Sequence, residues 1–496
     1  FNYLDSPAEV VASVSTTYVV VGVLSIIAVV VGIFLLYKIT LTAHMAERLA
    51  ALRLGMMKRI LGTIVHLVWG GLLFLCIRGG TDVSTANPGM VYFSDNAFLN
   101  SAAVNPAFNL FYSLSKVKDF SERANYFTPE ELEEKYAALE INTESQNSKQ
   151  LLTTQRPNVV LVILEGCGRT VYDTPNVMPN LKAVAAEGVE FTNCYANSFR
   201  TDRGVVCTLS GFPSYPDVSV MKLTDSKIAG LPSIARSLSR EGYDTEFIYG
   251  GDINFTNTNG YLLTTGYRRT FGEASFPEEQ RNDSKWGVHD EFAFEKTLQH
   301  VAQKDTLNPW MITLLTLSSH EPWEVPYNRI EGSPVENSFA YLDQSIGTFI
   351  KKFKTLEAWN NTLVVFIPDH GISHGLSEET MMVEKNRIPL ILTGGVLKES
   401  GLVEVVCNQS DLAATLLGQM DIRHDDFKMS RDVLSETYTL PFAINSWSQG
   451  VVMTDHMGST IYDLNTKKVS NTLDAPPASH AESIKVYLQK AYMLLK

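Results

Sequence analysis

The apolar positions of this chain follow two patterns, one at its N-terminal end and one from residue 158 onward. Residues 10–37 carry no charged side chain, and residues 18–36 are almost entirely Val, Ile, Leu, Gly and Ala. A helix rises about 1.5 Å per residue, so this run can cross a hydrocarbon core about 30 Å thick. Residues 60–77 form a second run near the lower length limit. We predict a membrane part, residues 1–78, with two transmembrane helices; a buried core helix is the alternative for the second run.

The segment between the two runs is strongly basic. It holds one acid, Glu47, against Lys38, Arg48, Arg53, Lys58 and Arg59. An excess of Lys and Arg marks cytoplasmic loops, so the outer ends of both helices are expected on the opposite side of the membrane. A chain that begins on that side needs something upstream to carry it there, and we therefore expect residues before Phe1. Everything after Arg78 is then extracytoplasmic.

Residues 79–157 have the composition of a juxtamembrane segment. Phe93, Phe98 and Phe111 lie in a polar background, whereas residues 145–155 are rich in Ser, Gln and Asn. The first half is suited to the membrane interface, and the second half is typical of a linker. Thr128-Pro129-Glu130-Glu131 predicts a helix start, because Thr128 can cap the helix while Glu131 completes a capping box.

From residue 158 onward, short runs of Val, Ile and Leu alternate with segments of helical periodicity. The predicted strands are residues 159–164, 189–195, 245–249, 311–317, 363–367 and 388–392. The predicted helices are residues 178–187, 232–240, 339–356 and 411–419, with a terminal helix from residue 481. Continuous apolar strands separated by helices are typical of a largely parallel sheet covered on both faces. We therefore predict an α/β domain over residues 158–496.

Side chains suited to catalysis stand at the ends of these predicted elements. Glu165 ends one strand, His320 follows another, and Asp369-His370 end a third. Ligands bind at the carboxyl ends of parallel strands, so these side chains are expected to face one cleft. Thr201 follows the strand at residues 189–195 and opens a helix, where free backbone N–H groups attract anions. Thr201 is either an ordinary N-cap or a nucleophile, which would need a base or a metal ion to activate it.

Charge and cysteine content narrow the function. The formal net charge of −13 argues against a nucleic-acid partner, which would favour a basic face. The five cysteines show no Cys-x-x-Cys spacing, so a structural zinc site is not expected. Cys194 and Cys207 bracket Thr201, and outside the cytosol they would either form a disulfide or remain buried thiols.

Two segments before Thr201 resemble the alkaline phosphatase and sulfatase superfamily, and within it the lipoteichoic acid synthase-like phosphoglycerol transferases. They are residues 178–181, Met-Pro-Asn-Leu, and residues 185–193, Ala-Ala-Glu-Gly-Val-Glu-Phe-Thr-Asn. Thr201 precedes Gly211 by the spacing of the nucleophile in formylglycine-dependent sulfatases, but it replaces their modified Cys or Ser, and Val205 replaces their Arg. A Thr nucleophile is typical of phosphoglycerol and phosphoethanolamine transferases. The resemblance implies five membrane helices, three of them before Phe1, and a small antiparallel sheet near residues 451–462.

The resemblance also implies a set of site residues. Glu165, Thr201, Asp369 and His370 would bind one divalent ion, usually Mn²⁺ in this family, with Zn²⁺ or Mg²⁺ also suited to such ligands. Residues 249–259 resemble the head-group-recognition segment. The expected substrate-binding residues are His320, Asp252, Asn257 and Arg203. Asn257 and Asn259 stand where the Gram-positive synthases have the Trp and Arg that clasp glycerol phosphate, which leaves the donor head group open.

These features together predict a metal-dependent phosphotransferase of the bacterial inner membrane, multi-pass, with an extracytoplasmic catalytic domain. It would move a phospho-head group, phosphoglycerol first, from a membrane phospholipid through Thr201 to a glycan or polymer acceptor, with His320 assisting. The enzymatic alternatives are a phosphoethanolamine transferase and a sulfatase-like hydrolase or phosphodiesterase. A non-enzymatic glycolipid receptor would be expected to have lost a metal ligand, and none of the four is missing.

Overall fold

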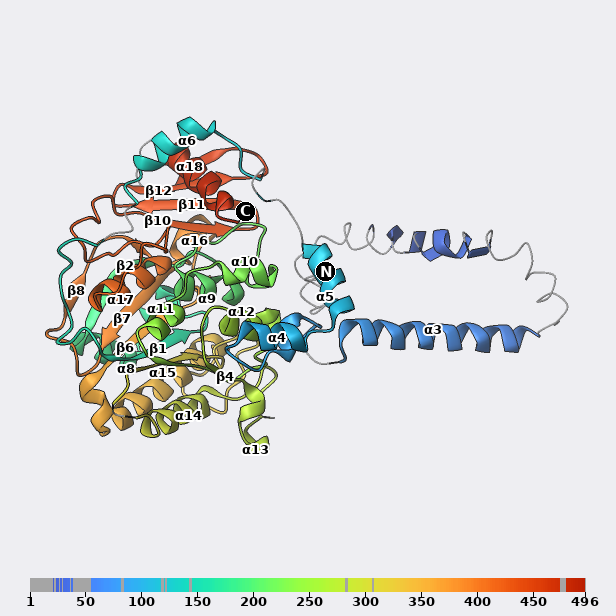
Figure 1. Cartoon of the computed structure of the whole chain (residues 1–496), viewed down its shortest axis with the longest axis horizontal. Coiled ribbons are helices and arrows are strands. Elements are labelled where there is room, and N and C mark those ends of the chain that lie inside the picture. The colour runs from blue at the N-terminus through green and yellow to red at the C-terminus, as the bar shows by residue number, and fades with distance from the viewer. Residues whose placement is uncertain are drawn as a thin grey trace. The chain divides into compact units, whose positions relative to one another are not determined.

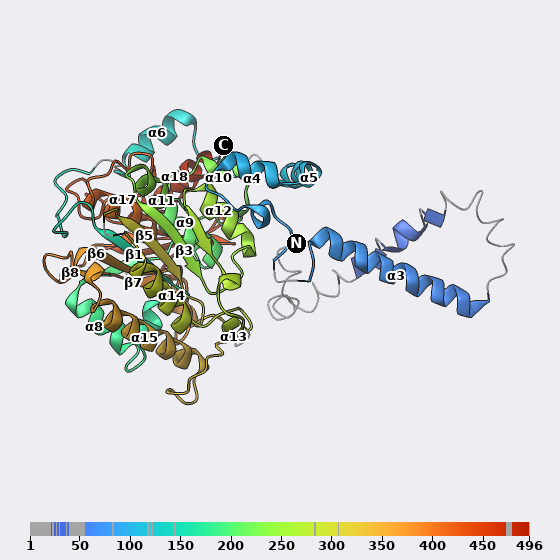
Figure 2. The same cartoon turned by 60° about the horizontal axis from the view of Figure 1, so that its bottom comes forward.

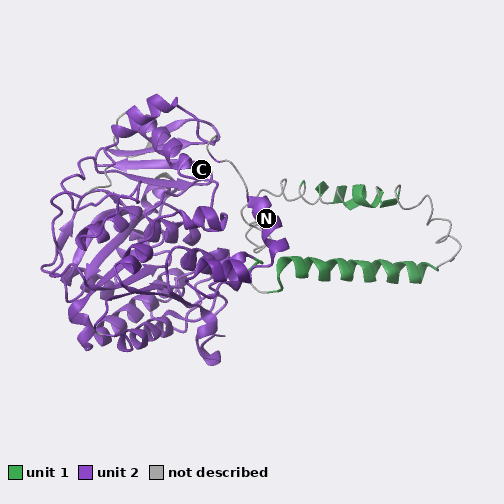
Figure 3. Ribbon diagram, viewed as in Figure 1, with its two compact units in different colours: residues 1–86 green, residues 87–496 purple. Residues whose placement is uncertain are grey.

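The computed structural model describes most of the chain as two compact units, residues 1–86 and 87–496 (Figure 3). The described residues are 55–81, 84–116, 120, 123–141, 145–281, 284–305, 307–472 and 479–495, with 21, 24, 25, 27, 28, 30–35, 37 and 38. The first predicted transmembrane run lies partly outside these residues. Most of the basic loop, residues 39–54, lies outside them altogether. The sidedness inferred from that loop therefore stays a prediction.

Helix α3, Met56–Arg78, contains the second predicted transmembrane run and starts a few residues before it. By length and composition it is the one helix among the described residues that could cross a membrane. It has 23 residues, none of them buried, and Arg78 lies in its last turn. Gly79 ends the helix in the left-handed conformation, with φ of 97°, a conformation that residues with a Cβ rarely adopt.

The second unit is built on a nine-stranded sheet with the order β4-β3-β5-β1-β6-β7-β2-β8, and β9 also pairs with β2 (Figure 1). The strands are β1 Asn158–Leu164, β2 Val189–Tyr195, β3 Asp244–Tyr249, β4 Arg269–Phe271, β5 Trp310–Leu315, β6 Thr362–Pro368, β7 Arg387–Thr393, β8 Gly401–Val403 and β9 Cys407–Asn408. Strand β7 runs antiparallel to both of its neighbours, and the other pairings described within this sheet are parallel. The predicted α/β fold with a mainly parallel sheet is confirmed.

Both faces of this sheet are covered by helices, which explains why its strands are continuously apolar. Helices α8 Pro179–Glu187, α14 Asp290–Ala302 and α15 Pro334–Phe353 lie on one face (Figure 2). Helices α9 Thr201–Ser210, α11 Ile234–Arg240 and α17 Leu412–Gln419 lie on the other. Alternate residues of β1 serve the two layers: Val159, Leu161 and Ile163 face the α9 side, and Val160, Val162 and Leu164 face the α15 side. All six are fully buried.

A separate antiparallel sheet near the C-terminus confirms the small sheet that was predicted there. Its strands are β10 Ala443–Trp447, β11 Gly450–Asp455, β12 Gly458–Asp463 and β13 Val469–Thr472. Helix α18, Ser479–Met493, packs on it and on α6, Pro129–Ala137, whose predicted capping box is present. Residues 145–155, expected as a linker, are instead packed against the domain. Leu151 and Leu152 are buried, and Leu152 bridges to Leu397.

The remaining described elements are short. The helices are α4 Ala97–Ala103, α5 Pro106–Lys116, α7 Arg169–Tyr172, α10 Asp225–Ala229, α12 Thr258–Thr264, α13 Glu278–Arg281 and α16 Glu378–Glu384. The 3₁₀ turns are η1 Pro88–Val91, η2 Val220–Lys222, η3 Phe255–Asn257, η4 Glu273–Ser275, η5 Glu357–Asn361 and η6 Gln409–Asp411. All five cysteines are free. Cys194 and Cys207 are thus separate buried thiols, and Cys194 lies opposite Cys407 in the β2–β9 pairing.

Candidate metal and nucleophile site

The carboxyl ends of the adjacent strands β1 and β6 bring three potential metal ligands together. Leu164 lies opposite Pro368 in the parallel register, so Glu165 and Asp369, the next residues, leave the sheet side by side. Ligand atoms of Glu165, Asp369 and His370 all lie within 4.8 Å of one another. The His370 ring contacts the Gly371 carbonyl through Nδ1, which leaves Nε2 3.5 Å from both Glu165 Oε1 and Asp369 Oδ2.

Thr201 is the first residue of α9, and its side chain points into this group. Its hydroxyl donates to Glu165 Oε2 at 3.1 Å. Arg200, not Thr201, is the N-cap residue, so the Thr201 hydroxyl is not used to cap the helix. The helix can approach this closely because of Gly204: a Cβ there would lie 2.0 Å from the Asp369 carbonyl oxygen. The structure therefore places a hydroxyl at a helix N-terminus against two carboxylates.

Glu165, Asp369 and His370 shift one another's pKa values. Burial would raise the pKa of Glu165, but hydrogen bonding and charge from His370, with the charge of His320, hold that pKa at about 2. Burial and the negative charge of Glu165 raise the pKa of Asp369 to about 7. Burial opposes protonation of His370, yet the charges of Asp369 and Glu165 raise its pKa to about 10. The electrostatic environment thus favours a positive charge at the point where these side chains meet.

A divalent cation fits this donor set. Two carboxylates, one imidazole and one hydroxyl are ligands that Mn²⁺, Zn²⁺ and Mg²⁺ accept. Asp369 Oδ2 is buried and makes no hydrogen bond to any residue that the structure describes. A buried carboxylate oxygen that accepts no hydrogen bond is costly, and coordination of a cation would remove that cost.

Residues that sequence reasoning missed hold the strand ends in place. Gln409 Nε2 donates to the Pro368 and Asp369 carbonyls, both at 2.8 Å. The Glu165 N–H donates to Thr316 Oγ1, while Ser319 Oγ donates to the Glu165 carbonyl. Strand β5 ends at Leu315, two residues before the predicted end at residue 317. Thr316 and Ser319, which follow it, hydrogen-bond to the Glu165 backbone. Only one sequence signal pointed here: Asn408 and Asp411 form a capping box around Gln409.

His320 follows Ser319, which contacts Glu165, and its ring packs against Trp286. The ring centroids of His320 and Trp286 are 4.5 Å apart. His320 Nδ1 is 2.8 Å from the Glu321 carbonyl oxygen, and Trp286 Nε1 donates to the same oxygen at 2.7 Å. Because a carbonyl only accepts, His320 Nδ1 carries hydrogen and Nε2 is the nitrogen left to exchange a proton with a substrate.

The remaining predicted substrate residues fall into two groups. Asn257 is buried, where its amide accepts from the Gly89 N–H and donates to the Met221 carbonyl. Arg203 donates to the Tyr215 and Pro216 carbonyls. Both side chains thus hold neighbouring segments of the domain together.

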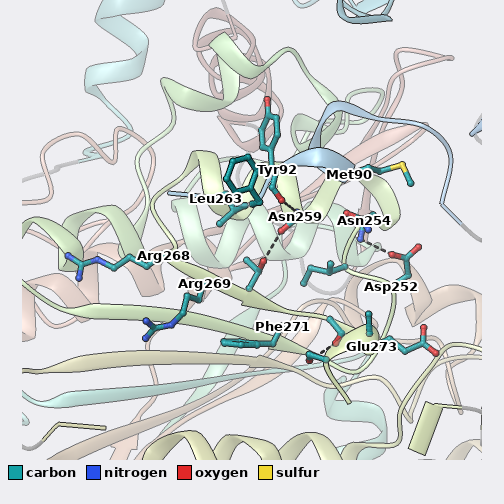
Figure 4. Close-up of a pocket in the computed structure, with 16 residues that line it drawn as sticks. Met90, Tyr92, Asp252, Asn254, Asn259, Leu263, Arg268, Arg269, Phe271 and Glu273 are labelled. Carbon is teal, nitrogen blue, oxygen red and sulfur yellow. Dashed lines mark hydrogen bonds between the residues drawn. The ribbon is translucent and has the colours of Figure 1, made fainter. Parts of the chain in front are cut away.

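Asp252 instead lines a cavity of about 560 Å³ (Figure 4). Asn259 and Glu273 lie on its wall, with Phe271 and Tyr92. Burial and the charge of Asp252 raise the pKa of Glu273. Residues 249–259 therefore contribute Asp252 to this cavity, and Asp252 stays a predicted substrate-binding residue.

The fold and this site define a class of protein. The sulfatase family model matches residues 157–422, more than half of the chain, and the chain belongs to that family. Phosphoglycerol transferase I of Xanthomonas axonopodis pv. citri (strain 306) is 24% identical over 289 residues, 53% of this chain and 40% of the relative. Lipoteichoic acid synthase 2 of Bacillus subtilis (strain 168) is 23% identical over 375 residues, 68% of this chain and 56% of the relative. The chain thus spans about half the length of these relatives.

Solved structures show the same fold. A protein in the alkaline phosphatase superfamily from Vibrio parahaemolyticus superposes with a TM-score of 0.64 at 23% identity and covers 75% of this chain and 98% of that one. The lipoteichoic acid synthase LtaP from Listeria monocytogenes superposes with a TM-score of 0.59 at 16% identity and covers 73% and 97%. The expected resemblance to the alkaline phosphatase and sulfatase superfamily is confirmed.

Proposed function

We propose that this chain transfers a phospho-head group, phosphoglycerol first, from a membrane phospholipid to a glycan or polymer acceptor. One observation carries the proposal: the Thr201 hydroxyl donates to Glu165 beside Asp369 and His370, at the edge of the sheet where ligands bind. The names of the relatives support this transfer over hydrolysis. The absence of the sulfatase Cys or Ser at position 201, and of Arg at position 205, supports it as well.

Glu165, Thr201, Asp369 and His370 would hold the divalent ion, with Mn²⁺ as the first choice. When bound, such an ion acts as a Lewis acid that lowers the pKa of a coordinated hydroxyl and stabilises negative charge on phosphoryl oxygens. Gln409 and Ser319 keep the ligand-bearing strand ends in register. Gly204 keeps the nucleophile helix in contact with them.

The side chains provide a two-step transfer. Thr201 Oγ releases its proton to solvent and forms a bond to the donor phosphorus as the bond from phosphorus to the lipid alcohol breaks, which leaves the head-group phosphate on Thr201. His320 gives a proton from Nε2 to the departing alcohol, and then takes one from the acceptor hydroxyl that attacks the phospho-threonine. Backbone N–H groups at the start of α9 stabilise the phosphoryl oxygens. The bond from phosphorus to Thr201 Oγ breaks, Thr201 takes up a proton from solvent, and the acceptor ends up with the head-group phosphate.

The cellular setting completes the proposal. The catalytic domain, residues 158–496, would lie outside the cytoplasm at the bacterial inner membrane. Residues 1–78 would be a multi-pass anchor with α3 as one span, and residues 79–157 a juxtamembrane part. A lipid donor explains why a soluble catalytic domain is tethered. The acceptor would be a polyhydroxylated glycan or polymer, and no nucleic acid is expected to bind.

The function is tested by supplying the full chain in bilayers with head-group-labelled phosphatidylglycerol, phosphatidylethanolamine or phosphatidylcholine, and an oligosaccharide acceptor. We expect labelled phosphoglycerol to appear on the acceptor, with diacylglycerol released in equal amount. If only ethanolamine phosphate were transferred, phosphatidylethanolamine would replace phosphatidylglycerol as the proposed donor. Release of the label only as a free phosphate ester would make the protein a hydrolase.

Metal binding is expected to depend on the clustered ligands. Asp369→Asn and Glu165→Gln should each weaken divalent-ion affinity by about 100-fold or more, because each replaces an anionic ligand by a neutral amide. Binding of Mn²⁺ alone, measured by titration calorimetry on the chelator-treated protein, checks this without an activity assay. Asp252→Asn is the matched control and should bind Mn²⁺ like the unchanged chain. Equal Mn²⁺ affinity in the unchanged chain and all three variants would contradict the proposed ligand set.

A further inference from the structure

Helices α4 and α5 expose an apolar surface that no described residue covers. It consists of Phe93, Phe98, Leu99, Leu110, Phe111 and Leu114, and is called the α4–α5 surface below. Phe98 and Phe111 are the most exposed of the six, at 77% and 71%. In both cartoon views, these helices lie at the outside of the second unit (Figures 1 and 2). Exposed large apolar side chains gathered on two consecutive short helices are typical of an interaction site.

This surface is fixed to the catalytic unit. Tyr92 and Val104, which flank α4, and Phe108 of α5 pack with Leu263 of α12. The Tyr92 hydroxyl bonds to Asp225, and Asn259 donates to the Gly89 and Tyr92 carbonyls. These contacts fix the segment that carries the α4–α5 surface to the unit that contains Thr201. The side chains of that surface point away from these contacts and are therefore exposed.

The helices themselves are well formed. Asn96 accepts from the Phe98 and Leu99 N–H groups and caps α4. Asn105 accepts from the Ala107 and Phe108 N–H groups at the start of α5. Each cap pairs two of the N–H groups that are free at a helix start, which lowers the cost of entering a less polar medium. No Asp, Glu, Lys or Arg occurs between Asp95 and Lys116, so residues 96–115 would carry no charged side chain into the bilayer.

Chain connectivity favours a lipid surface as the occupant. Phe93 follows Arg78, the last residue of α3, by about 15 residues, which reach at most ~50 Å when fully extended. If α3 crosses a bilayer, the α4–α5 surface cannot move far from the face at which α3 emerges. A surface with aromatic and Leu side chains, uncharged and rimmed by Asn and Ser, has the composition of an interfacial segment.

We propose that the α4–α5 surface inserts into the interfacial region of the bilayer and holds the catalytic unit at the surface that contains the lipid donor. The consequence for catalysis rests on the proposed function, whereas the insertion does not. The rival occupant is a second copy of this chain, which would cover the same side chains without contacting lipid.

Insertion is tested with the full chain in phosphatidylcholine nanodiscs. Phe111→Cys in a Cys76→Ser background is labelled with an environment-sensitive fluorophore, since the other four cysteines are buried. Leu402→Cys, at an exposed apolar position on β8, is the matched control. We expect blue-shifted emission at position 111 and at least two-fold quenching by lipids brominated near the head-group end of the acyl chain, with neither effect at position 402.

Two results would overturn the proposal. In the first, the label at position 111 is as exposed to water as the label at position 402. In the second, the label at position 111 is shielded from water but not quenched by brominated lipid, and this position cross-links to a second copy of the chain. The second result would make this surface an interface between copies.

The functional consequence is measured with a double variant, Phe98→Ser with Phe111→Ser, beside Leu402→Ser. We expect the double variant to lose about ten-fold of its transfer rate from phosphatidylglycerol in bilayers, and to keep its rate with a water-soluble, short-chain donor. An unchanged bilayer rate would contradict the positioning role. If the unchanged chain used neither donor while the position-111 label was quenched, the proposed function would fail and the membrane contact would stand.

Discussion

Thr201→Ala is expected to lower head-group transfer by about 10⁴-fold or more, the scale on which loss of a nucleophile acts. The variant lacks the oxygen of the proposed nucleophile, while the proposed metal ligands Glu165, Asp369 and His370 remain. The fold should change little, because the Thr201 side chain contributes one hydrogen bond, to Glu165, and is not the helix cap. Initial rates with labelled phosphatidylglycerol in bilayers measure the effect, and the thermal midpoint confirms that the protein is folded.

Thr201→Ser is the matched control. It retains a hydroxyl at the same place and should keep a measurable fraction of the activity. Mass spectrometry of the unchanged chain incubated with donor and no acceptor should find glycerol phosphate on Thr201, and none on the Ala variant. Full transfer by Thr201→Ala would exclude the covalent step, and a direct displacement by the acceptor hydroxyl would take its place.

Gly204→Ala is expected to reduce transfer by about 100-fold, even though residue 204 carries no reactive group. Its Cβ would lie 2.0 Å from the Asp369 carbonyl oxygen, a backbone atom that cannot turn aside. Helix α9 and the end of β6 must therefore separate, and a displacement near 1 Å in an active site costs about two orders of magnitude in rate. Overpacking of this kind also costs about 1–3 kcal/mol of stability, which denaturant unfolding measures.

Gly230→Ala separates this effect from the general cost of replacing glycine. Gly230 has ordinary helical φ and ψ, and the nearest atom to an added Cβ is 3.5 Å away. This variant should retain its activity and stability. Reduced Mn²⁺ affinity in Gly204→Ala, but not in Gly230→Ala, would show that the helix and the ligands move apart. Unchanged transfer by folded Gly204→Ala would show that the contact between α9 and Asp369 does not set the site geometry.

The sequence by itself determined the elements and their local chemistry. Continuous apolar runs such as residues 159–164 and 363–367 predict buried strands, because only a sheet covered on both faces hides every side chain. The start of α6 at Thr128 followed from its capping box, whose hydrogen bonds are local. Glu165, Thr201 and Asp369-His370 were marked by their places at strand and helix ends. Each of these patterns spans only a few consecutive residues, so the local sequence is enough to predict the local conformation.

Only the tertiary structure decided which of these residues meet. Glu165 and Asp369 are neighbours because β1 pairs with β6, and strand order depends on packing between segments far apart in sequence. Asn257 has the chemistry of a substrate ligand, yet η1 covers it, so its burial depends on Gly89, a residue distant along the chain. The roles of Gln409 and Gly204 are likewise invisible in isolation. The Gln409 amide donates to the Asp369 carbonyl, and the absence of a Cβ at Gly204 lets α9 approach that same carbonyl. Both roles depend on where the Asp369 backbone lies, which is decided by packing and not by residue type.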